Sequence, residues 1–470
     1  MPPADAIAGP APAPSDRMTA SGKRYPTTSL CLGYGVGSSG VAILLNTVSV
    51  YFPTLMATVL GMDPAIAGAL LMGSKIYDAF ADVIIGASSD KLKAKYGRRP
   101  FLFAGAVISF LSLLMIFVAP VMGKTETIVY MAVALVIYST GYSLFNVPYL
   151  AMPAEITRGS RERLKLISFR TAAIGLGQLT ALALSAWLID VGGGGAGGYR
   201  TMGLIMAVLA LVTMMIAFFT VRFAVTEAST GSTHALTRKD FASLLQNRPL
   251  FTLLGAKLCQ YIAFGVLMPI NLLFLLNVMS LGYMGMIHLA VVQNLAVFAS
   301  QPAWTRIGRK LGKRKAYLLA QAIMIPVVMS WYWADATTGV AGVWWRGAVF
   351  GFASGGALLM STSMLPDTIE YDRLKNGVER GGVFAGLYAV NEKVGFAIGA
   401  AVLGFGLSLA GYVATTGGAI VQQSAATISA LYGIKTTAPA VMLCVGVILL
   451  LFYNLDEARL DAMRSQKADD

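Results

Sequence analysis

Long apolar stretches recur along the whole chain and alternate with short polar segments. Each stretch is long enough to cross a hydrocarbon core of about 30 Å as a helix that rises about 1.5 Å per residue. The pattern therefore predicts an all-α membrane protein. The twelve predicted membrane helices cover residues 29–58, 65–89, 101–122, 127–153, 166–189, 201–224, 250–277, 283–304, 316–334, 340–365, 383–411 and 436–454.

The composition excludes an ordinary soluble domain, because 56% of the 470 residues are hydrophobic and only 13% are charged. The net charge of +13 would suggest nucleic-acid binding in a soluble protein. Here the basic residues gather in alternate loops, at residues 90–99, 158–165 and 306–315, whereas the opposite loops carry one each, at Lys124, Arg200 and Lys435. This positive-inside pattern places both termini in the cytoplasm and predicts a multi-pass protein of a bacterial inner membrane.

The chain divides into two similar halves. We expect a disordered cytoplasmic tail over residues 1–27, six-helix bundles over residues 28–224 and 250–455, a central cytoplasmic loop over 225–249 and a second tail over 456–470. Each half repeats a basic, glycine-containing loop between its second and third helices, at residues 90–99 and 306–315. This repeat resembles the major facilitator superfamily, whose two bundles rock around a central site.

Two carboxylates interrupt the second apolar stretch. Asp78 and Asp82 are four residues apart and therefore share one helix face. They lie roughly 18 and 12 Å inside Asp90 by helical rise, and Asn146 and Lys393 reach a similar depth on two other predicted helices. A carboxylate at this depth normally faces a cavity, a cation or a basic partner. We therefore predict a cation-coupled transporter in which Lys393 pairs with the two acids.

Three stretches narrow the resemblance: residues 75–82 (KIYDAFAD), residues 141–149 (GYSLFNVPY), and residues 365–384 followed by Lys393. Together they resemble the glycoside–pentoside–hexuronide:cation symporters, the group of the melibiose permease. The resemblance implies that Asp78 and Asp82 bind the coupling cation, with Ser143 and Asn146 as further ligands. It implies that the substrate is bound by Asn146, Tyr149, Arg170 and Lys393.

Departures from the family pattern bear on the substrate. Ala42 stands where the family has a sugar-binding aspartate, and Asn146 replaces a second one, whereas Arg170 and Lys393 are kept. Because a guanidinium can bind a carboxylate through two parallel hydrogen bonds, we expect an anionic sugar such as a hexuronide or glucuronide. Arg170 lies only about 8 Å inside Lys165 by helical rise, so a place in a cytoplasmic gate stays open for it.

The coupling cation stays open between Na⁺ and H⁺. Hard cations need several oxygen ligands, which Asp78, Asp82, Ser143 and Asn146 can supply in part. Ala81 removes one family ligand, whereas a proton needs only one carboxylate. No other cofactor or metal is expected.

Further polar residues are predicted to act around the site. Those expected as charge partners or gate residues are Lys75, Asp90, Arg98, Glu155, Arg158, Asp367, Asp372 and Arg380. Lys257, Gln260 and Tyr261 form a polar face that lines the cavity or joins helices. The residues expected in an interfacial aromatic belt are Trp331, Trp333, Trp344 and Trp345.

These features predict secondary active symport of a glycoside-type solute by alternating access, with the solute, the cation and the bilayer as partners. The alternative is a cation-coupled carrier of a lysolipid or other amphiphile, because Leu150 and Leu358 replace aromatic residues and make the cavity more apolar. The sequence contains no nucleophile–base set, metal cluster or Walker motif, so neither an enzyme nor an ATP-driven pump is expected.

Overall fold

The computed structural model describes residues 26–157, 160–222, 247–376, 381–455, 459–463 and 465. Almost all of the predicted N-terminal tail and central loop lie outside these ranges, as do Arg158 and Arg380. The first half contains α1 (Thr28–Thr54) with the π-helical turn η1 (Leu55–Val59), α2 (Pro64–Tyr96), α3 (Arg99–Phe117), α4 (Lys124–Ile156), α5 (Ser160–Leu179) joined through η2 (Thr180–Leu184) to α6 (Ser185–Val191), and α7 (Ala196–Val221). The second half contains α9 (Arg248–Asn277), α10 (Gly282–Leu311), α11 (Lys313–Met329) with η3 (Ser330–Trp333), α12 (Gly339–Asn376), α13 (Gly381–Leu409) and α14 (Ala425–Leu451).

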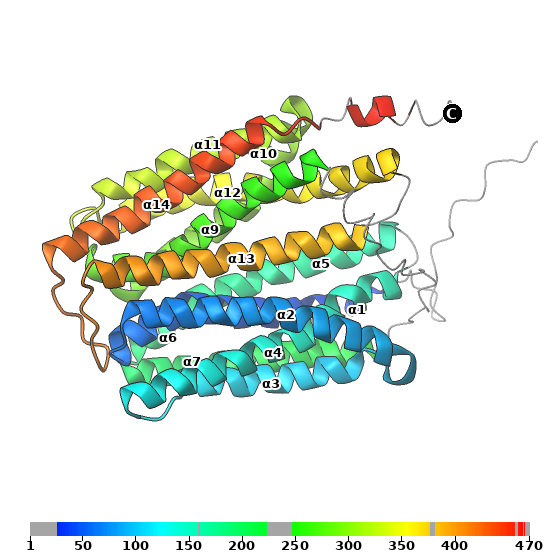
Figure 1. Ribbon diagram of the computed structural model, residues 1–470. Helices are drawn as coiled ribbons and strands as arrows, with labels where there is room; N and C mark the ends of the chain where they lie inside the picture. The colour runs from blue at the N-terminus through cyan, green and yellow to red at the C-terminus, as the bar shows by residue number, and fades with distance from the viewer. Residues whose placement is uncertain are drawn as a thin grey trace, which may run out of the picture.

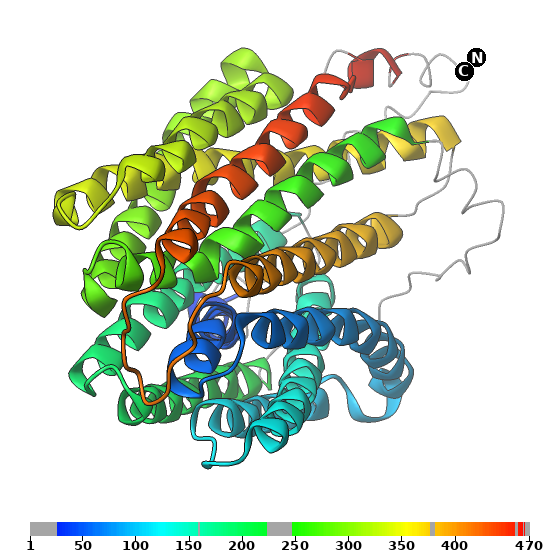
Figure 2. The ribbon, with the colours of Figure 1, turned by 60° about the vertical axis from the view of Figure 1, so that its left-hand side comes forward.

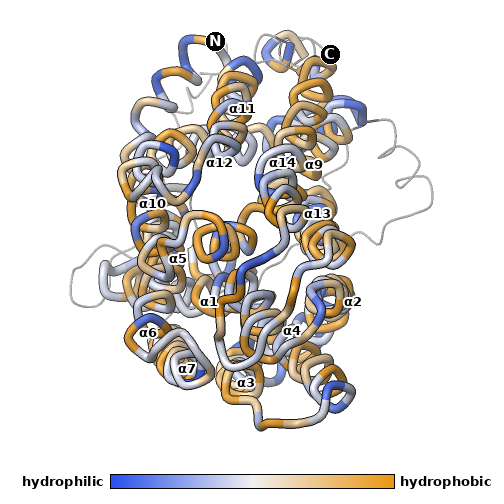
Figure 3. The backbone as a smooth tube through the Cα atoms, turned by 90° about the vertical axis from the view of Figure 1, so that its left-hand side faces the viewer, coloured by the Kyte–Doolittle hydropathy of each residue, from blue (hydrophilic) through white to orange (hydrophobic). Residues whose placement is uncertain are grey.

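The predicted helical architecture is confirmed. Counting α1 with η1, α5 with α6 and α11 with η3, the described residues form twelve long rods, and eleven of them have the length and hydropathy of a membrane span. The exception is α2, the helix that carries Lys75, Asp78 and Asp82. The rods lie roughly parallel in Figure 1, and the view along them in Figure 3 shows predominantly hydrophobic tubes.

Two predicted boundaries are clearly wrong. The tenth helix was expected to end at residue 365, but α12 continues to Asn376, so Asp367 and Asp372 lie on a helix and not in a loop. The last helix was expected to begin after Lys435, but α14 begins at Ala425 and contains Lys435 in its third turn. Ser424 caps the helix, because its hydroxyl accepts a hydrogen bond of 3.1 Å from the backbone N–H of Thr427. Lys435 is therefore a membrane-embedded lysine and not a loop residue.

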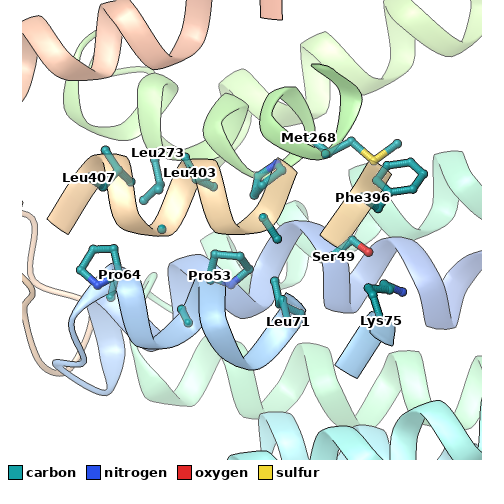
Figure 4. A pocket seen from close by; sticks show the side chains of 17 residues that line it. Ser49, Pro53, Pro64, Leu71, Lys75, Met268, Leu273, Phe396, Leu403 and Leu407 are labelled. Carbon is teal, nitrogen blue, oxygen red and sulfur yellow. The ribbon is translucent and has the colours of Figure 1, made fainter. Parts of the chain in front are cut away.

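The two bundles meet most extensively along α2 and α13, and α5 and α6 approach α10. Gly68 on α2 and Gly404 on α13 allow the close approach, since a Cβ atom on Gly68 would lie 2.7 Å from the carbonyl oxygen of Ala400. A residual cavity of about 30 Å³ between the bundles is lined mainly by apolar side chains such as Pro53, Leu71 and Phe396 (Figure 4). Tight apolar packing therefore joins the bundles here.

The connection between α13 and α14 closes one end of the molecule, called the sealed end below. It crosses onto the end of α1, as the orange-brown loop in Figure 2 shows. The backbone N–H groups of Thr415 and Gly417 donate hydrogen bonds of 2.8 and 2.9 Å to the carbonyl oxygens of Ala57 and Val59. Tyr283 on α10 donates to the carbonyl oxygen of Gly194 in the first bundle at 3.3 Å.

The opposite end, called the basic end below, carries the basic segments at residues 90–99 and 306–315, which are helix ends joined by very short turns. The ion pairs found there among the described residues lie within single bundles. In the first bundle, the Arg98 guanidinium contacts Glu155 at 2.9 Å and Asp90 at 2.6 Å. In the second, Lys313 contacts Asp367 at 2.7 Å. These pairs brace each bundle separately.

Candidate transport site

A cavity of about 770 Å³ lies between the bundles and is lined by residues of both. Contacts at the sealed end close it on one side. Its walls include Leu150, which lies near the basic end of α4, and Leu358, in the middle of α12; these residues are 45% and 52% exposed. The contacts at the sealed end leave the basic end as the side from which the cavity can be reached.

An acid–lysine cluster lies on the cavity wall. The i, i+4 spacing on α2 directs Asp78 and Asp82 to one side, where α4 contributes Ser143 and α13 contributes Lys393. The Lys393 ammonium lies 2.8 Å from Asp78 Oδ2 and also pairs with Asp82 Oδ2. It donates a further hydrogen bond of 3.1 Å to the carbonyl oxygen of Asp78. These ion pairs connect the first bundle to the second through charge.

Ser143 joins the two carboxylates from the other side. Its Oγ lies 2.8 Å from Asp78 Oδ1 and 2.6 Å from Asp82 Oδ1. A hydroxyl group has one hydrogen, so it donates to one carboxylate at a time. A cation or proton held between the carboxylates would complete the other contact. Asp78 is buried, whereas the side chain of Asp82 is 25% exposed and provides the access from the cavity.

Lys75 is buried one turn before Asp78. Its ammonium lies 5.6 Å from the centroid of the Tyr138 ring, and its side chain borders both cavities. Within the described ranges Lys75 forms no ion pair with Asp78 or Asp82. It contributes positive charge near the cluster and does not contact the carboxylates directly.

The residues expected to bind substrate separate into two groups. Asn146 and Arg170 line the cavity; the Asn146 amide donates to the Tyr142 hydroxyl at 3.3 Å, and Arg170 Nε is buried with no hydrogen-bond partner among the described residues. Tyr149 does not reach the cavity. Its ring stacks on Tyr34 at 4.3 Å, and its hydroxyl donates to the Tyr34 carbonyl oxygen. The placement of Tyr149 in the substrate site is therefore corrected: it joins α4 to α1.

The second bundle supplies a polar wall. Lys257, Gln260 and Tyr261 line the cavity, and Lys257 donates to Gln260 Oε1 at 3.1 Å. Glu392, one residue before Lys393, also lines the cavity and accepts a hydrogen bond of 3.2 Å from the Tyr261 hydroxyl. The sequence reasoning did not single out Glu392.

Near the sealed end, Trp331, Arg346 and Lys435 line the cavity. Trp331 was expected in the interfacial belt but is buried. Its ring faces Arg346 and Lys435 in the cavity wall instead of the membrane surface. The other belt residues are exposed as predicted: Trp333, Trp344 and Trp345.

Lys435 was missed because its helix was predicted to start too late. The signal that could have placed it is Ser424, a typical N-cap residue. No proline stands between Ser424 and Lys435, so the helix that begins at this cap continues through the lysine without a break.

The cavity wall has an excess of positive charge. Among the described residues that line it, the ionisable ones are Lys75, Arg170, Lys257, Arg346, Lys393 and Lys435 on the basic side, and Asp78, Asp82 and Glu392 on the acidic side. Six basic groups thus face three acidic ones. In a site of low dielectric constant such an excess favours a negatively charged ligand.

Apart from Lys75, the predicted gate residues that the structure describes lie at the basic end. Arg98, Asp90 and Glu155 form the brace of the first bundle, and Asp367 belongs to that of the second. Asp372 is buried and accepts a hydrogen bond of 2.8 Å from Asn376. Their part in gating stays a prediction.

Comparisons with known proteins agree with this architecture. A family model described as MFS/sugar transport protein matches residues 33–457. The uncharacterized symporter YnaJ of Bacillus subtilis is 28% identical, with 91% of this chain and 92% of that protein covered. The isoprimeverose transporter of Lactiplantibacillus pentosus is 25% identical, with 90% and 88% covered. The glucuronide carrier protein homolog of Escherichia coli is 24% identical, with 91% and 93% covered.

A solved structure of a bacterial homologue of the human drug peptide transporters PepT1 and PepT2 has a similar fold. The TM-score is 0.65 over 93% of this chain and 99% of that one, at 13% sequence identity. The family match spans both bundles, and the relatives are named as symporters and carriers. The chain therefore belongs to the MFS/sugar transport protein family, in the group of the glycoside–pentoside–hexuronide:cation symporters, and is a multi-pass membrane transporter rather than an enzyme.

Proposed function

We propose that this protein carries out cation-coupled symport of an anionic, sugar-type solute by alternating access. The observation that carries the proposal is the cavity itself, in which an acid–lysine cluster bridges the two bundles and the basic side chains outnumber the acidic ones. The first feature suits a coupling cation and the second suits a solute with a negative charge.

The coupling follows from competition at the two carboxylates. In the structure the Lys393 ammonium occupies the position that a cation would take beside Asp78 and Asp82. A sodium ion or proton bound there displaces Lys393, which weakens the ion pair between the bundles and adds positive charge to the cavity. Both effects favour binding of an anion, and the anion favours the cation by the same factor, because binding coupling is reciprocal.

The sugar part of the proposal rests on the relatives. One is named as an isoprimeverose transporter and another as a glucuronide carrier homolog. The loss of acids at Ala42 and Asn146 and the excess of basic groups favour a glucuronide-like solute over a neutral one.

The test is uptake into proteoliposomes of 4-nitrophenyl β-D-glucuronide and of 4-nitrophenyl β-D-glucoside. The two compounds differ only at C6, which is a carboxylate in the first and a hydroxymethyl group in the second. A sodium gradient and a proton gradient are imposed in separate arms. We expect one gradient to drive accumulation of the glucuronide and little of the glucoside. Absence of gradient-driven uptake of both compounds would contradict the proposal.

A second candidate is an amphiphilic solute, for which the exposed side chains of Leu150 and Leu358 provide an apolar surface on the cavity wall. Uptake of a lysophospholipid in the same proteoliposomes tests it. Gradient-driven lysophospholipid uptake without glucuronide uptake would favour this candidate.

A further inference from the structure

Two buried cations share one aromatic ring near the sealed end of the cavity. Lys435 on α14 is 2% exposed and Arg346 on α12 is 5% exposed. The Lys435 ammonium lies 4.3 Å, and the Arg346 guanidinium 5.4 Å, from the centroid of the Trp331 ring. The two like charges are therefore held together in a setting of low polarity.

The hydrogen bonds of the two cations differ. Arg346 is held by neutral acceptors: Nη1 donates to the Gly342 carbonyl oxygen, Nη2 to the Ser330 carbonyl oxygen, both at 3.0 Å, and Nε to Ser330 Oγ at 3.2 Å. Lys435 donates to Asn271 Oδ1. An ammonium group has three N–H donors, so Lys435 keeps two for a ligand.

Neither cation has a carboxylate partner within the described part of the chain. The acid closest to Arg346 in sequence is Asp335, which is exposed and accepts hydrogen bonds from Thr337 and Thr338 instead. Arg346 also lies 4.5 Å from the centroid of the Trp345 ring, and Lys435 lies 5.9 Å from that of Phe274. A buried charge without a counter-ion is costly, and contacts with aromatic faces compensate only part of that cost. An anion bound in the cavity beside the Trp331 ring would supply the missing negative charge.

The depth of Lys435 fits a solute that reaches both charged groups of the cavity. It lies ten residues after Ala425, roughly 15 Å from the start of α14, whereas Lys393 lies roughly 24 Å from the end of α13 at Leu409. Measured along helical rise from the sealed-end terminus of each helix, the two lysine backbone positions thus differ by about 9 Å. A sugar ring with an anionic substituent is long enough to cover an offset of this size.

We propose that Lys435 binds the anionic group of the solute, with Arg346 as a fixed second positive charge and Asn271 as the residue that orients the ammonium. This inference rests on the proposed function. It places the carboxylate of a glucuronide-like solute in the second bundle near the sealed end, and not at Arg170 in the first bundle, for which the sequence left carboxylate binding and a gate role open.

The test is calorimetric titration of the purified full-length protein with the matched glucuronide and glucoside. Lys435→Gln is expected to weaken glucuronide binding about 10- to 100-fold, as for loss of a hydrogen bond to a charged group, and to change glucoside binding less than about threefold. Lys435→Arg keeps the charge and is expected to retain the preference. Arg170→Gln, the matched change in the first bundle, is expected to affect both sugars alike.

Asn271→Asp is a second variant, which keeps Lys435 and changes only the group that accepts its hydrogen bond. It places an internal carboxylate beside Lys435, so it should abolish the glucuronide preference and raise Tm. Titration with sodium chloride and with inorganic phosphate distinguishes a free anion from the solute's own group. Lys435-dependent binding of chloride or phosphate, with an unchanged glucuronide preference in Lys435→Gln, would overturn the inference.

Other results separate the two proposals. A wild type that binds neither sugar contradicts the proposed function. A wild type that prefers the glucuronide, together with a Lys435→Gln or Asn271→Asp variant that prefers it equally, overturns the assignment of Lys435 and leaves the function standing. Loss of the preference in Arg170→Gln alone also overturns the assignment.

Discussion

The glycine contact between α2 and α13 keeps the sealed end closed, and its disruption has a predictable effect. In Gly68→Ala the new Cβ would lie 2.7 Å from the Ala400 carbonyl oxygen and 2.9 Å from Gly404 Cα. Ordinary van der Waals contacts of a Cβ begin at 3.4 Å, so the two backbones must separate by several tenths of an ångström. The substitution therefore penalises the conformation in which this end is closed.

The expected size follows from overpacking. An added methyl group in a packed interface costs about 1–3 kcal/mol. If the conformation open at this end lacks the contact, the equilibrium shifts toward it about 5- to 150-fold, since each 1.4 kcal/mol is about a factor of ten. A minor state of about 1% would become clearly populated.

The assay is a distance distribution from pulsed electron paramagnetic resonance. Spin labels on cysteines replacing Val121 and Leu409, which are exposed at the sealed end in different bundles, report on its opening. The native Cys31, Cys259 and Cys444 are replaced beforehand.

The matched control is Gly73→Ala on the same helix, where a Cβ would meet nothing within 4 Å. We expect a longer-distance population in Gly68→Ala only. The reasoning is refuted if Gly68→Ala and Gly73→Ala give the same distribution while both proteins remain folded by thermal melting.

Three further changes test the charged groups. Asp82→Asn should abolish gradient-driven glucuronide accumulation but keep glucuronide exchange across proteoliposomes, because the solute's anionic group binds elsewhere; loss of both would contradict this separation. Ser143→Ala removes the hydroxyl that joins the two carboxylates and should weaken cation binding about tenfold in titrations, and an unchanged affinity would exclude Ser143 as a ligand. Arg98→Ala breaks its buried pair with Glu155, which costs about 3–5 kcal/mol for such pairs, so Tm should fall by several degrees; a Tm equal to that of the wild type would show that the brace contributes nothing.

The acid–lysine cluster could be predicted because it follows from local rules. The i, i+4 spacing fixes Asp78 and Asp82 on one face, and helical rise brings Lys393 to their depth. Charged groups inside a membrane require partners, which predicts their mutual contact. The structure brings these three residues together with Ser143, as the resemblance implied.

The site near the sealed end could not be predicted in the same way. Its lysine was assigned to a loop because the start of α14 mixes Ser, Thr and Gly with apolar residues, which lowers the hydropathy signal. Trp331 lies at the end of a helix, where a belt residue and a cavity residue have the same sequence environment. The contact of Gly68 with Gly404 joins two helices that are far apart in the chain, and no local pattern encodes which glycines meet.

The measurement that tests the account most directly is the affinity for 4-nitrophenyl β-D-glucuronide as a function of the cation. Sodium is varied at constant pH, and pH is varied at constant sodium, for the wild type and Asp82→Asn. The account predicts that one of the two cations strengthens glucuronide binding in the wild type and has no such effect in Asp82→Asn. Binding that is independent of both cations, or a cation effect that persists in Asp82→Asn, would contradict it.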